Sequence, residues 1–129
     1  MAKRSASKDL LEFEIAFYER LLQDHPDFPD ALIALGEAYT RHGWHEKGLA
    51  VDLKLTQLKP EHPTVWYNLA CSLSLLKRYD EALEALRRST LLGYNDVQHL
   101  LKDPDLASLR QIPKFRRFLE TLTTSPQSP

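Results

Sequence analysis

Five histidines are the residues of this chain best able to bind a metal ion or to act as a general base: His25, His42, His45, His62 and His99. Two of them flank Gly43-Trp44 in a predicted turn between helices, whereas His25 and His62 fall in predicted turns at the opposite end of the helix pairs. A zinc site needs three or four ligands that meet at one point. We therefore expect solvated turn histidines and no metal site.

The single cysteine, Cys71, is the one candidate for a nucleophilic thiol. A catalytic thiol needs a nearby base and an electropositive setting, and no histidine is placed in the sequence to supply them. Pairs of carboxylates, such as Asp80/Glu81 and Asp103/Asp105, stand where they can cap helices or lie on hydrophilic faces. The sequence contains no glycine-rich phosphate loop, nucleophile elbow or zinc-ligand spacing. It therefore predicts no enzyme and no cofactor.

A basic cluster near the C-terminus is the candidate for nucleic-acid binding, with Arg110, Lys114, Arg116 and Arg117. Phe115 and Phe118 alternate with these residues, but they also have the spacing of a buried helix face. Nucleic-acid binding would require exposed aromatic side chains beside the positive charges. We therefore expect a solvated basic face and no nucleic-acid partner.

Composition narrows the class of protein further. The 129 residues carry a formal net charge of −1, which argues against binding nucleic acid or anionic lipid through bulk charge. No apolar run approaches the about 18 residues that a transmembrane helix needs. The N-terminus lacks the apolar stretch of a secretory signal, and a lone cysteine fits a reducing compartment. We expect a cytoplasmic protein without a membrane partner.

The elements that position these residues repeat along the chain. A shift of 34 residues aligns Pro26 with Pro60 and Pro29 with Pro63, and it also aligns four leucine pairs and one threonine pair, 21/55, 35/69, 49/83, 58/92 and 56/90. This period is typical of a solenoid of helix–turn–helix units. One stretch, 49–55, also alternates like a strand, but its place in the repeat favours a helix.

The repeated units resemble the tetratricopeptide repeat (TPR) family. The second unit contains Trp66-x2-Leu69-Ala70-x2-Leu73 followed by Tyr79-Asp80-Glu81-Ala82-Leu83, and the first contains Leu32-x2-Leu35-Gly36-x2-Tyr39. Three residues depart from the family pattern: Asp52 replaces a large apolar side chain, His45 stands where the second unit has Tyr79, and Tyr94 replaces the closing proline. The first two departures argue against tight packing of the second helix of unit one.

The resemblance implies an all-α fold, a short right-handed solenoid of antiparallel helix pairs with a C-terminal helical lid. We expect a disordered N-terminus over 1–7, one domain over 8–122 and a disordered tail over 123–129. The domain divides into a half unit, two repeats and a cap, at 8–28, 29–62, 63–96 and 97–122. The apolar residues of 8–24 form two adjacent stripes on one broad face of the first helix.

The same resemblance implies a concave groove lined by the first helix of each unit. It assigns ten residues to protein binding: Ile33, Glu37, Arg41, Thr64, Tyr67, Asn68, Cys71, Leu75, Leu101 and Lys102. Chaperone-binding members of the family grip an acidic C-terminus with a clamp of Lys and Asn. Here only Asn68 and, loosely, Lys102 match that clamp, while Ile33 and Glu37 stand at clamp positions. We therefore expect a partner other than an acidic C-terminus.

The sequence leaves three functions open, all without a reactive centre. The first is an adaptor that binds a peptide segment of another protein in the groove. The second is a self-assembling structural module, because a solenoid end that is poorly covered can pair with another copy. The third is a secretion or assembly chaperone.

Overall fold

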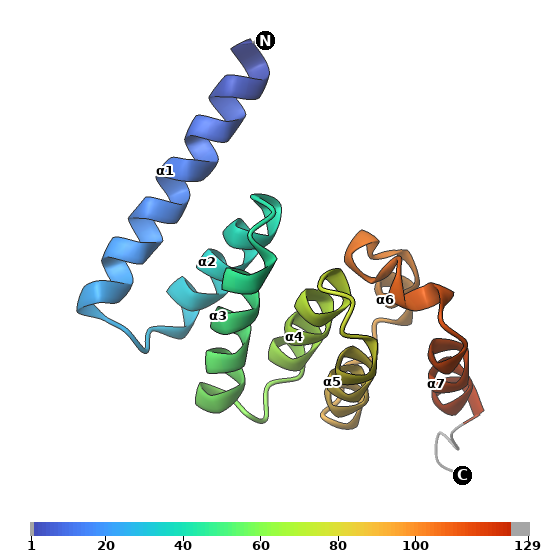
Figure 1. Ribbon diagram of the computed structural model, residues 1–129. Coiled ribbons are helices and arrows are strands. Elements are labelled where there is room, and N and C mark those ends of the chain that lie inside the picture. The colour runs from blue at the N-terminus through green and yellow to red at the C-terminus, as the bar shows by residue number, and fades with distance from the viewer. Residues whose placement is uncertain (1, 125–129) are drawn as a thin grey trace. The chain divides into compact units, whose positions relative to one another are not determined.

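Helices form all the regular secondary structure of the part of the chain that the structure describes. The computed structural model describes residues 2–124, with the side chains of residues 8–122. The chain divides into two compact units, Met1–Pro60 and Glu61–Pro129. The predicted all-α, TPR-like fold with helices packed in adjacent pairs is confirmed (Figure 1).

The first unit contains α1 (Ala2–Asp24), α2 (Pro29–Arg41) and α3 (His45–Leu58). The helix α2 packs against both α1 and α3. The core of this unit consists of Ile15, Leu35, Ala38 and Tyr39, and partly buried Leu11, Tyr18, Leu22 and Val51 pack against them. The side chain of Lys54 on α3 donates a hydrogen bond to the carbonyl of Pro26, 2.8 Å away, and thereby fastens the turn between α1 and α2.

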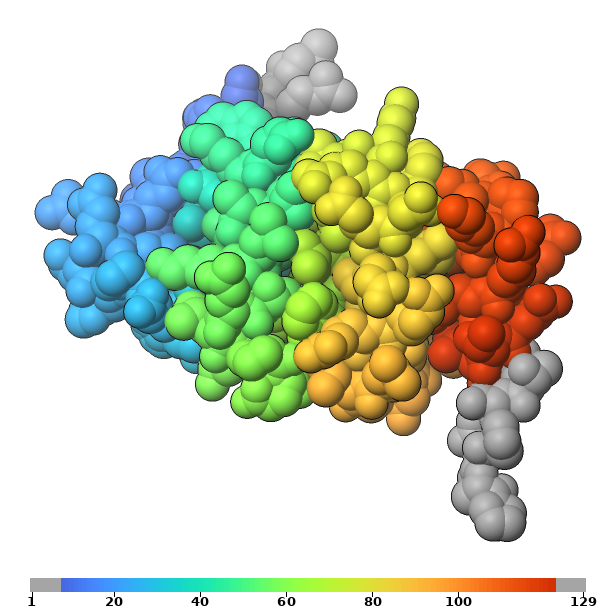
Figure 2. Space-filling view, turned by 60° about the horizontal axis from the view of Figure 1, so that its bottom comes forward, coloured from blue at the N-terminus to red at the C-terminus, as the bar shows by residue number. Residues whose placement is uncertain are grey.

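The second unit contains the helices α4 (Pro63–Leu75), α5 (Tyr79–Leu91), α6 (Val97–Lys102) and α7 (Pro113–Thr124), with the 3-10 turns η1 (Pro104–Leu106) and η2 (Leu109–Gln111) before α7. The helices α4 and α5 form an extensive pair, and α7 covers α5. Figure 2 shows the surfaces of α5 and α7 in contact. Leu86, Leu106, Leu109 and Phe115 are among the most deeply buried side chains of this unit.

The helix boundaries follow the local chemistry of the chain. Pro29 and Pro63 occupy the first turns of α2 and α4, where a missing N–H leaves no bond unmade. The side chain of Asp96 caps α6 by accepting a hydrogen bond from the backbone N–H of His99 at 3.0 Å. The helix α1 begins at Ala2 rather than at the predicted residue 8. Of the expected tail, residues 125–129 lie outside the described part.

The stretch 49–55 is helical, as the repeat predicted, and lies in α3. Asp52 is buried there, facing α2 at Gly36. A Cβ atom at position 36 would lie 3.2 Å from Oδ1 of Asp52 and 3.4 Å from Cγ1 of Val51. The small residue therefore makes room for a buried carboxylate where the family has an apolar side chain, and α3 packs closely despite the departure.

The turns inside the two repeats share a left-handed residue at the same register position. Gly43 has φ of +84°, and Lys77, which stands 34 residues later, has φ of +63°. Glycine adopts this conformation readily, whereas a side chain with a Cβ is strained there. The second repeat therefore carries a local strain that the first repeat avoids.

We predict that Lys77→Gly raises the free energy of unfolding by about 0.5–1 kcal/mol. Relief of the left-handed backbone, roughly 1–2 kcal/mol, is partly offset by the greater chain entropy of glycine in the unfolded state. Urea denaturation followed by circular dichroism measures the change. Gly43→Lys is the matched opposite substitution and should destabilise the protein; a loss of stability on Lys77→Gly would contradict the interpretation.

Candidate functional site

In the first unit the predicted binding residues lie along one side of α2. Ile33, Glu37 and Arg41 follow one another at intervals of four residues, so they fall on the same face of the helix. Ile33 is half-buried, and the other two are exposed. The Arg41 guanidinium forms an ion pair with Glu14 of α1, whereas Glu37 forms no ion pair or hydrogen bond with any side chain that the structure describes. The face thus offers one apolar group and one free carboxylate.

The aromatic residue beside this face is fixed by α1. The hydroxyl of Tyr39 donates a hydrogen bond to the carboxylate of Glu19. Burial of the phenol, and then this bond to Glu19, raise the pKa of Tyr39 well above its ordinary value. Tyr39 is therefore a neutral hydrogen-bond donor, and it ties α2 to α1 behind the exposed face.

In the second unit a buried carboxylate, Asp103, organises the region around α4. Its Oδ2 accepts a hydrogen bond from the Tyr67 hydroxyl at 2.7 Å, and the Cys71 thiol lies 3.7 Å from the same oxygen. His99 Nε2 lies 3.2 Å from this oxygen, and the backbone N–H of Asp105 donates to Oδ1 at 2.9 Å. The cap thus closes over α4.

Further contacts brace the second repeat and the cap internally. The ring of Tyr94 stacks on Tyr67 with centroids 4.5 Å apart and an angle of 11° between the planes. The Arg110 guanidinium donates to the backbone carbonyls of Leu100 and Asp103, at 3.1 and 2.7 Å. Arg110 is therefore part of the cap's own framework rather than a free cation for a ligand.

This arrangement changes the predicted groove in the second unit. Tyr67 and Cys71 were predicted to face a partner, but both are buried beneath the chain's own cap. Of the other predicted binding residues in this unit, Asn68 and Leu75 are half-buried, and Thr64, Leu101 and Lys102 are exposed. The surface left for a partner is therefore smaller and more polar than the sequence predicted.

The buried cluster also bears on chemistry at Cys71. Ligand atoms of Cys71, Asp103 and Asp105 lie within 4.8 Å of one another, which is close enough to hold a metal ion. The Asp103 oxygens, however, already face hydrogen-bond donors from α4 and from η1. The cluster therefore has a structural role, which is to join the cap to α4.

Sequence reasoning placed no histidine near Cys71, yet the fold brings His99 next to the carboxylate that contacts the thiol. Asp103 was predicted as part of a helix-capping pair, and its buried role was missed. The contacts of Asp103 with Cys71 and Tyr67 join residues 32 and 36 positions apart, and no local pattern encodes such a separation.

The basic residues of α7 are not accompanied by exposed phenylalanine side chains. Phe115 and Phe118 are buried, as the spacing predicted. Lys114 pairs with Asp80 at 3.0 Å, and Arg116 and Arg117 are exposed. The aromatic side chains that a single-stranded nucleic acid would stack on are thus turned into the core.

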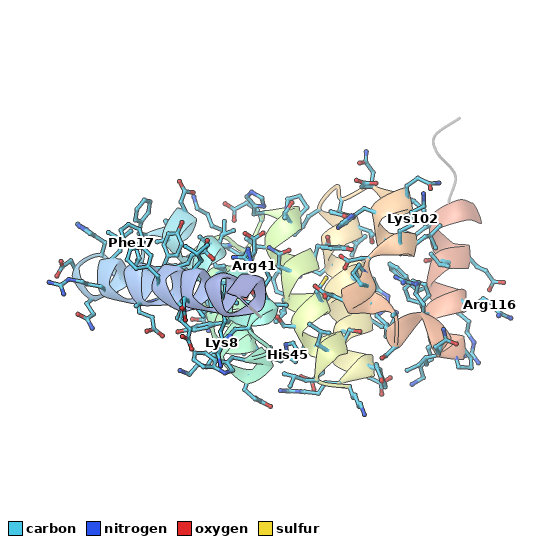
Figure 3. All side chains as sticks on the ribbon, turned by 90° about the horizontal axis from the view of Figure 1, so that it is seen from above. Lys8, Phe17, Arg41, His45, Lys102 and Arg116 are labelled. Carbon is cyan, nitrogen blue, oxygen red and sulfur yellow. The ribbon has the colours of Figure 1, made fainter. Side chains whose placement is uncertain are left out.

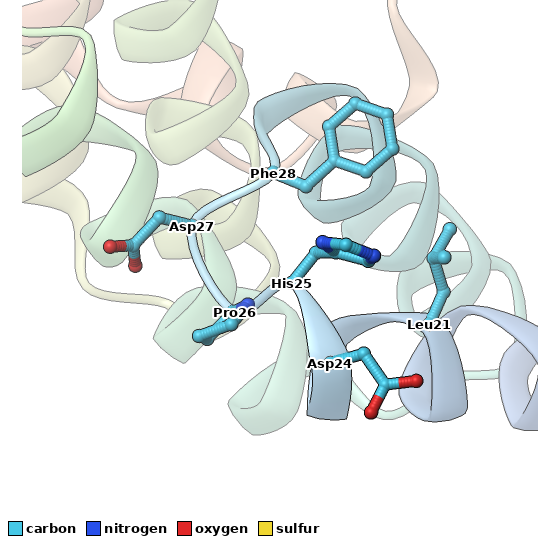
Figure 4. Close-up of a pocket in the computed structure, with 6 residues that line it drawn as sticks. All are labelled: Leu21, Asp24, His25, Pro26, Asp27 and Phe28. Carbon is cyan, nitrogen blue, oxygen red and sulfur yellow. The ribbon is translucent and has the colours of Figure 1, made fainter.

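The turn after α1 borders an open hollow of about 670 Å³. Figure 4 shows Leu21, His25 and Phe28 around it, together with Asp24, Pro26 and Asp27. No residue of this turn was predicted to bind a partner. The hollow is mostly apolar and lies at the C-terminal end of α1.

Two comparisons place the chain among known proteins. The family model described as "Anaphase-promoting complex, cyclosome, subunit 3" matches residues 8–89. The chain is also 30% identical over 93 residues to a protein of Arabidopsis thaliana whose name describes it as chloroplastic, a match that covers 70% of this chain and 28% of that relative. The chain thus spans well under half the length of the curated relative. Since that relative is named for the chloroplast, the cytoplasmic location expected of this chain stays a prediction.

Within the described residues, no helix combines the length and the apolar character needed to cross a membrane.

We predict that Asp103→Ala loosens the cap and exposes Cys71. The substitution leaves the buried Tyr67 hydroxyl without its acceptor, which costs about 1–3 kcal/mol. Because Cys71 is the chain's single cysteine, the rate of its reaction with a thiol reagent reports on the opening directly. Asp80→Ala, which removes an exposed carboxylate that pairs with Lys114, is the control and should leave the labelling rate unchanged. Equal rates for the two variants would contradict the role given to Asp103.

We also predict that the free energy of unfolding falls as the pH rises above about 10, because the Tyr67 phenol is buried in the folded chain. Burial first, then Cys71 and the bond to Asp103, raise the pKa of this phenol far above its ordinary value of 10.0. The unfolded phenol ionises near pH 10.0 and the folded one does not, so the stabilisation is present below that pH and is lost as the pH rises. The loss reaches up to about 1.4 kcal/mol per pH unit for one group. Urea titrations between about pH 8 and about pH 11, on either side of the ordinary phenol pKa, should show a shallower fall for Tyr67→Phe than for the unaltered chain.

Proposed function

Because the chain belongs to the family of anaphase-promoting complex, cyclosome, subunit 3, a tetratricopeptide-type repeat family, we propose that it is an adaptor that binds a peptide segment of another protein. Repeats of this type serve as protein–protein interaction modules and are generally non-catalytic scaffolds. The proposal concerns which surface binds and what chemistry the peptide has.

The observation that carries the proposal is the open face of α2. Ile33 and Glu37 lie one helical turn apart, and the described side chains provide Glu37 with no partner. Tyr39, behind this face, is held to α1 by Glu19, and Arg41, on the face itself, is held to α1 by Glu14. The face is therefore preorganised, since the surrounding side chains do not need to be ordered when a peptide binds.

The chemistry of this face selects the peptide. A free carboxylate attracts Lys, Arg or an amino terminus and repels a carboxylate, while Ile33 offers a small apolar contact. We propose a segment in which a basic residue stands beside an apolar one. In the second unit, Thr64, Asn68, Leu75, Leu101 and Lys102 are the predicted binding residues that remain open to further contacts.

The proposed face is tested by the double variant Ile33→Ser/Glu37→Arg. We expect it to bind basic–apolar peptides on a synthetic peptide array about tenfold more weakly or worse, because a charge-assisted contact contributes roughly 1.5–3 kcal/mol. Far-ultraviolet circular dichroism should stay unchanged, since neither side chain is in the core.

Glu61→Arg is the matched control, because it makes the same charge reversal in the exposed turn before α4. It should leave the array pattern as it is. Binding that survives in the double variant, or that falls equally in the control, would reject the α2 face as the site.

A further inference from the structure

The helix α1 carries a second apolar stripe that its own unit leaves uncovered. Leu11, Ile15, Tyr18 and Leu22 pack in or against the core of the first unit. The adjacent residues Leu10, Phe13 and Phe17 are 69%, 72% and 53% exposed. The sequence predicted one broad apolar face; the structure buries one half of it and leaves the other half in solvent.

This exposed stripe runs along most of α1 from residue 10 onward. Phe13 and Phe17 are one turn apart, and Leu21, which borders the hollow described above, continues the line by another turn. Figure 3 places Phe17 and Lys8 on opposite sides of α1. A continuous row of large apolar groups on a protein surface is the usual mark of an interaction site.

We propose that a second copy of this chain covers the stripe, with the two α1 helices side by side and antiparallel. The two phenylalanines of the stripe are symmetric about residue 15, which lies midway between Phe13 and Phe17. Antiparallel pairing centred there places Phe13 of one copy against Phe17 of the other, twice. Such a self-complementary contact is what a twofold dimer requires.

The charges beside the stripe have nearly the same centre of symmetry. Asp9 and Arg20 are eleven residues apart, close to three helical turns, so they lie on the same flank of the stripe. Both are exposed, and neither forms an ion pair with another side chain in the described part of the chain. The antiparallel pairing brings Asp9 of each copy beside Arg20 of the other, whereas a parallel pairing places these flanks on opposite sides of the interface and forms neither ion pair.

The area of the stripe sets the strength of the pairing. An aromatic side chain buries about 150–250 Å² at most, so three partly exposed side chains per copy offer several hundred Å² in all. A stable protein interface buries about 1,200–2,000 Å². The dimer is therefore reversible and depends on protein concentration.

Sedimentation equilibrium over a series of concentrations tests the pairing. The unaltered chain should shift from monomer to dimer as its concentration rises, and Phe13→Glu should remain monomeric throughout. Leu91→Glu is the matched control, because Leu91 is an apolar residue on α5 that is 79% exposed, and it should leave the association unchanged.

A charge exchange tests the antiparallel register. Asp9→Arg alone and Arg20→Asp alone should each weaken the dimer about two- to thirty-fold, since two surface ion pairs of roughly 0.2–1 kcal/mol each are lost. The double variant Asp9→Arg/Arg20→Asp restores both pairs with their signs exchanged and should recover the original dissociation constant.

The proposal is overturned if the unaltered chain stays monomeric at every concentration, if Leu91→Glu weakens association as much as Phe13→Glu, or if the charge exchange fails to restore it. Binding of a different protein by the stripe of a strictly monomeric chain would also overturn it. The α2 variants leave α1 unchanged, so the proposed adaptor function is tested independently of the proposed dimer.

Discussion

The buried carboxylate of Asp103 is the contact that determines how much of the second unit is available to a partner. A charged group is costly to remove from water unless donors surround it, and here the Tyr67 hydroxyl and the Asp105 backbone N–H donate to it while Cys71 and His99 lie close by. Those donors come from α4 and from the cap, so satisfying the carboxylate requires the two to be in contact. Closure of the cap is thus a condition of burying Asp103.

The two units therefore expose different surfaces, although each contains one copy of the repeat. In the first, α2 keeps an open face with an unpaired carboxylate at Glu37, within the part of the chain that the structure describes, and α1 holds α2 in place through Glu14 and Glu19. In the second, the corresponding helix is partly covered by residues beyond the repeat, and Tyr67 and Cys71 have become core residues. The chain's own cap competes for the surface that a repeat of this kind otherwise offers to a ligand.

The helices and their ends could be predicted because their signals are local. Proline in a first turn, glycine with positive φ and the 34-residue period act over a few residues or repeat in register, and α3 is helical in spite of its strand-like alternation. The burial of Tyr67 could not be predicted, because it depends on a carboxylate 36 residues away in the sequence. Periodicity likewise identified both apolar stripes of α1, but it carries no information on which of them has a neighbour to pack against.

The contact between Gly36 and Asp52 couples two positions on different helices. A methyl group at position 36 would lie 3.2 Å from a carboxylate oxygen of Asp52, so an alanine there requires that side chain to shift by a few tenths of an ångström. This pair is accordingly a place where the effects of substitutions on fitness should be epistatic rather than additive.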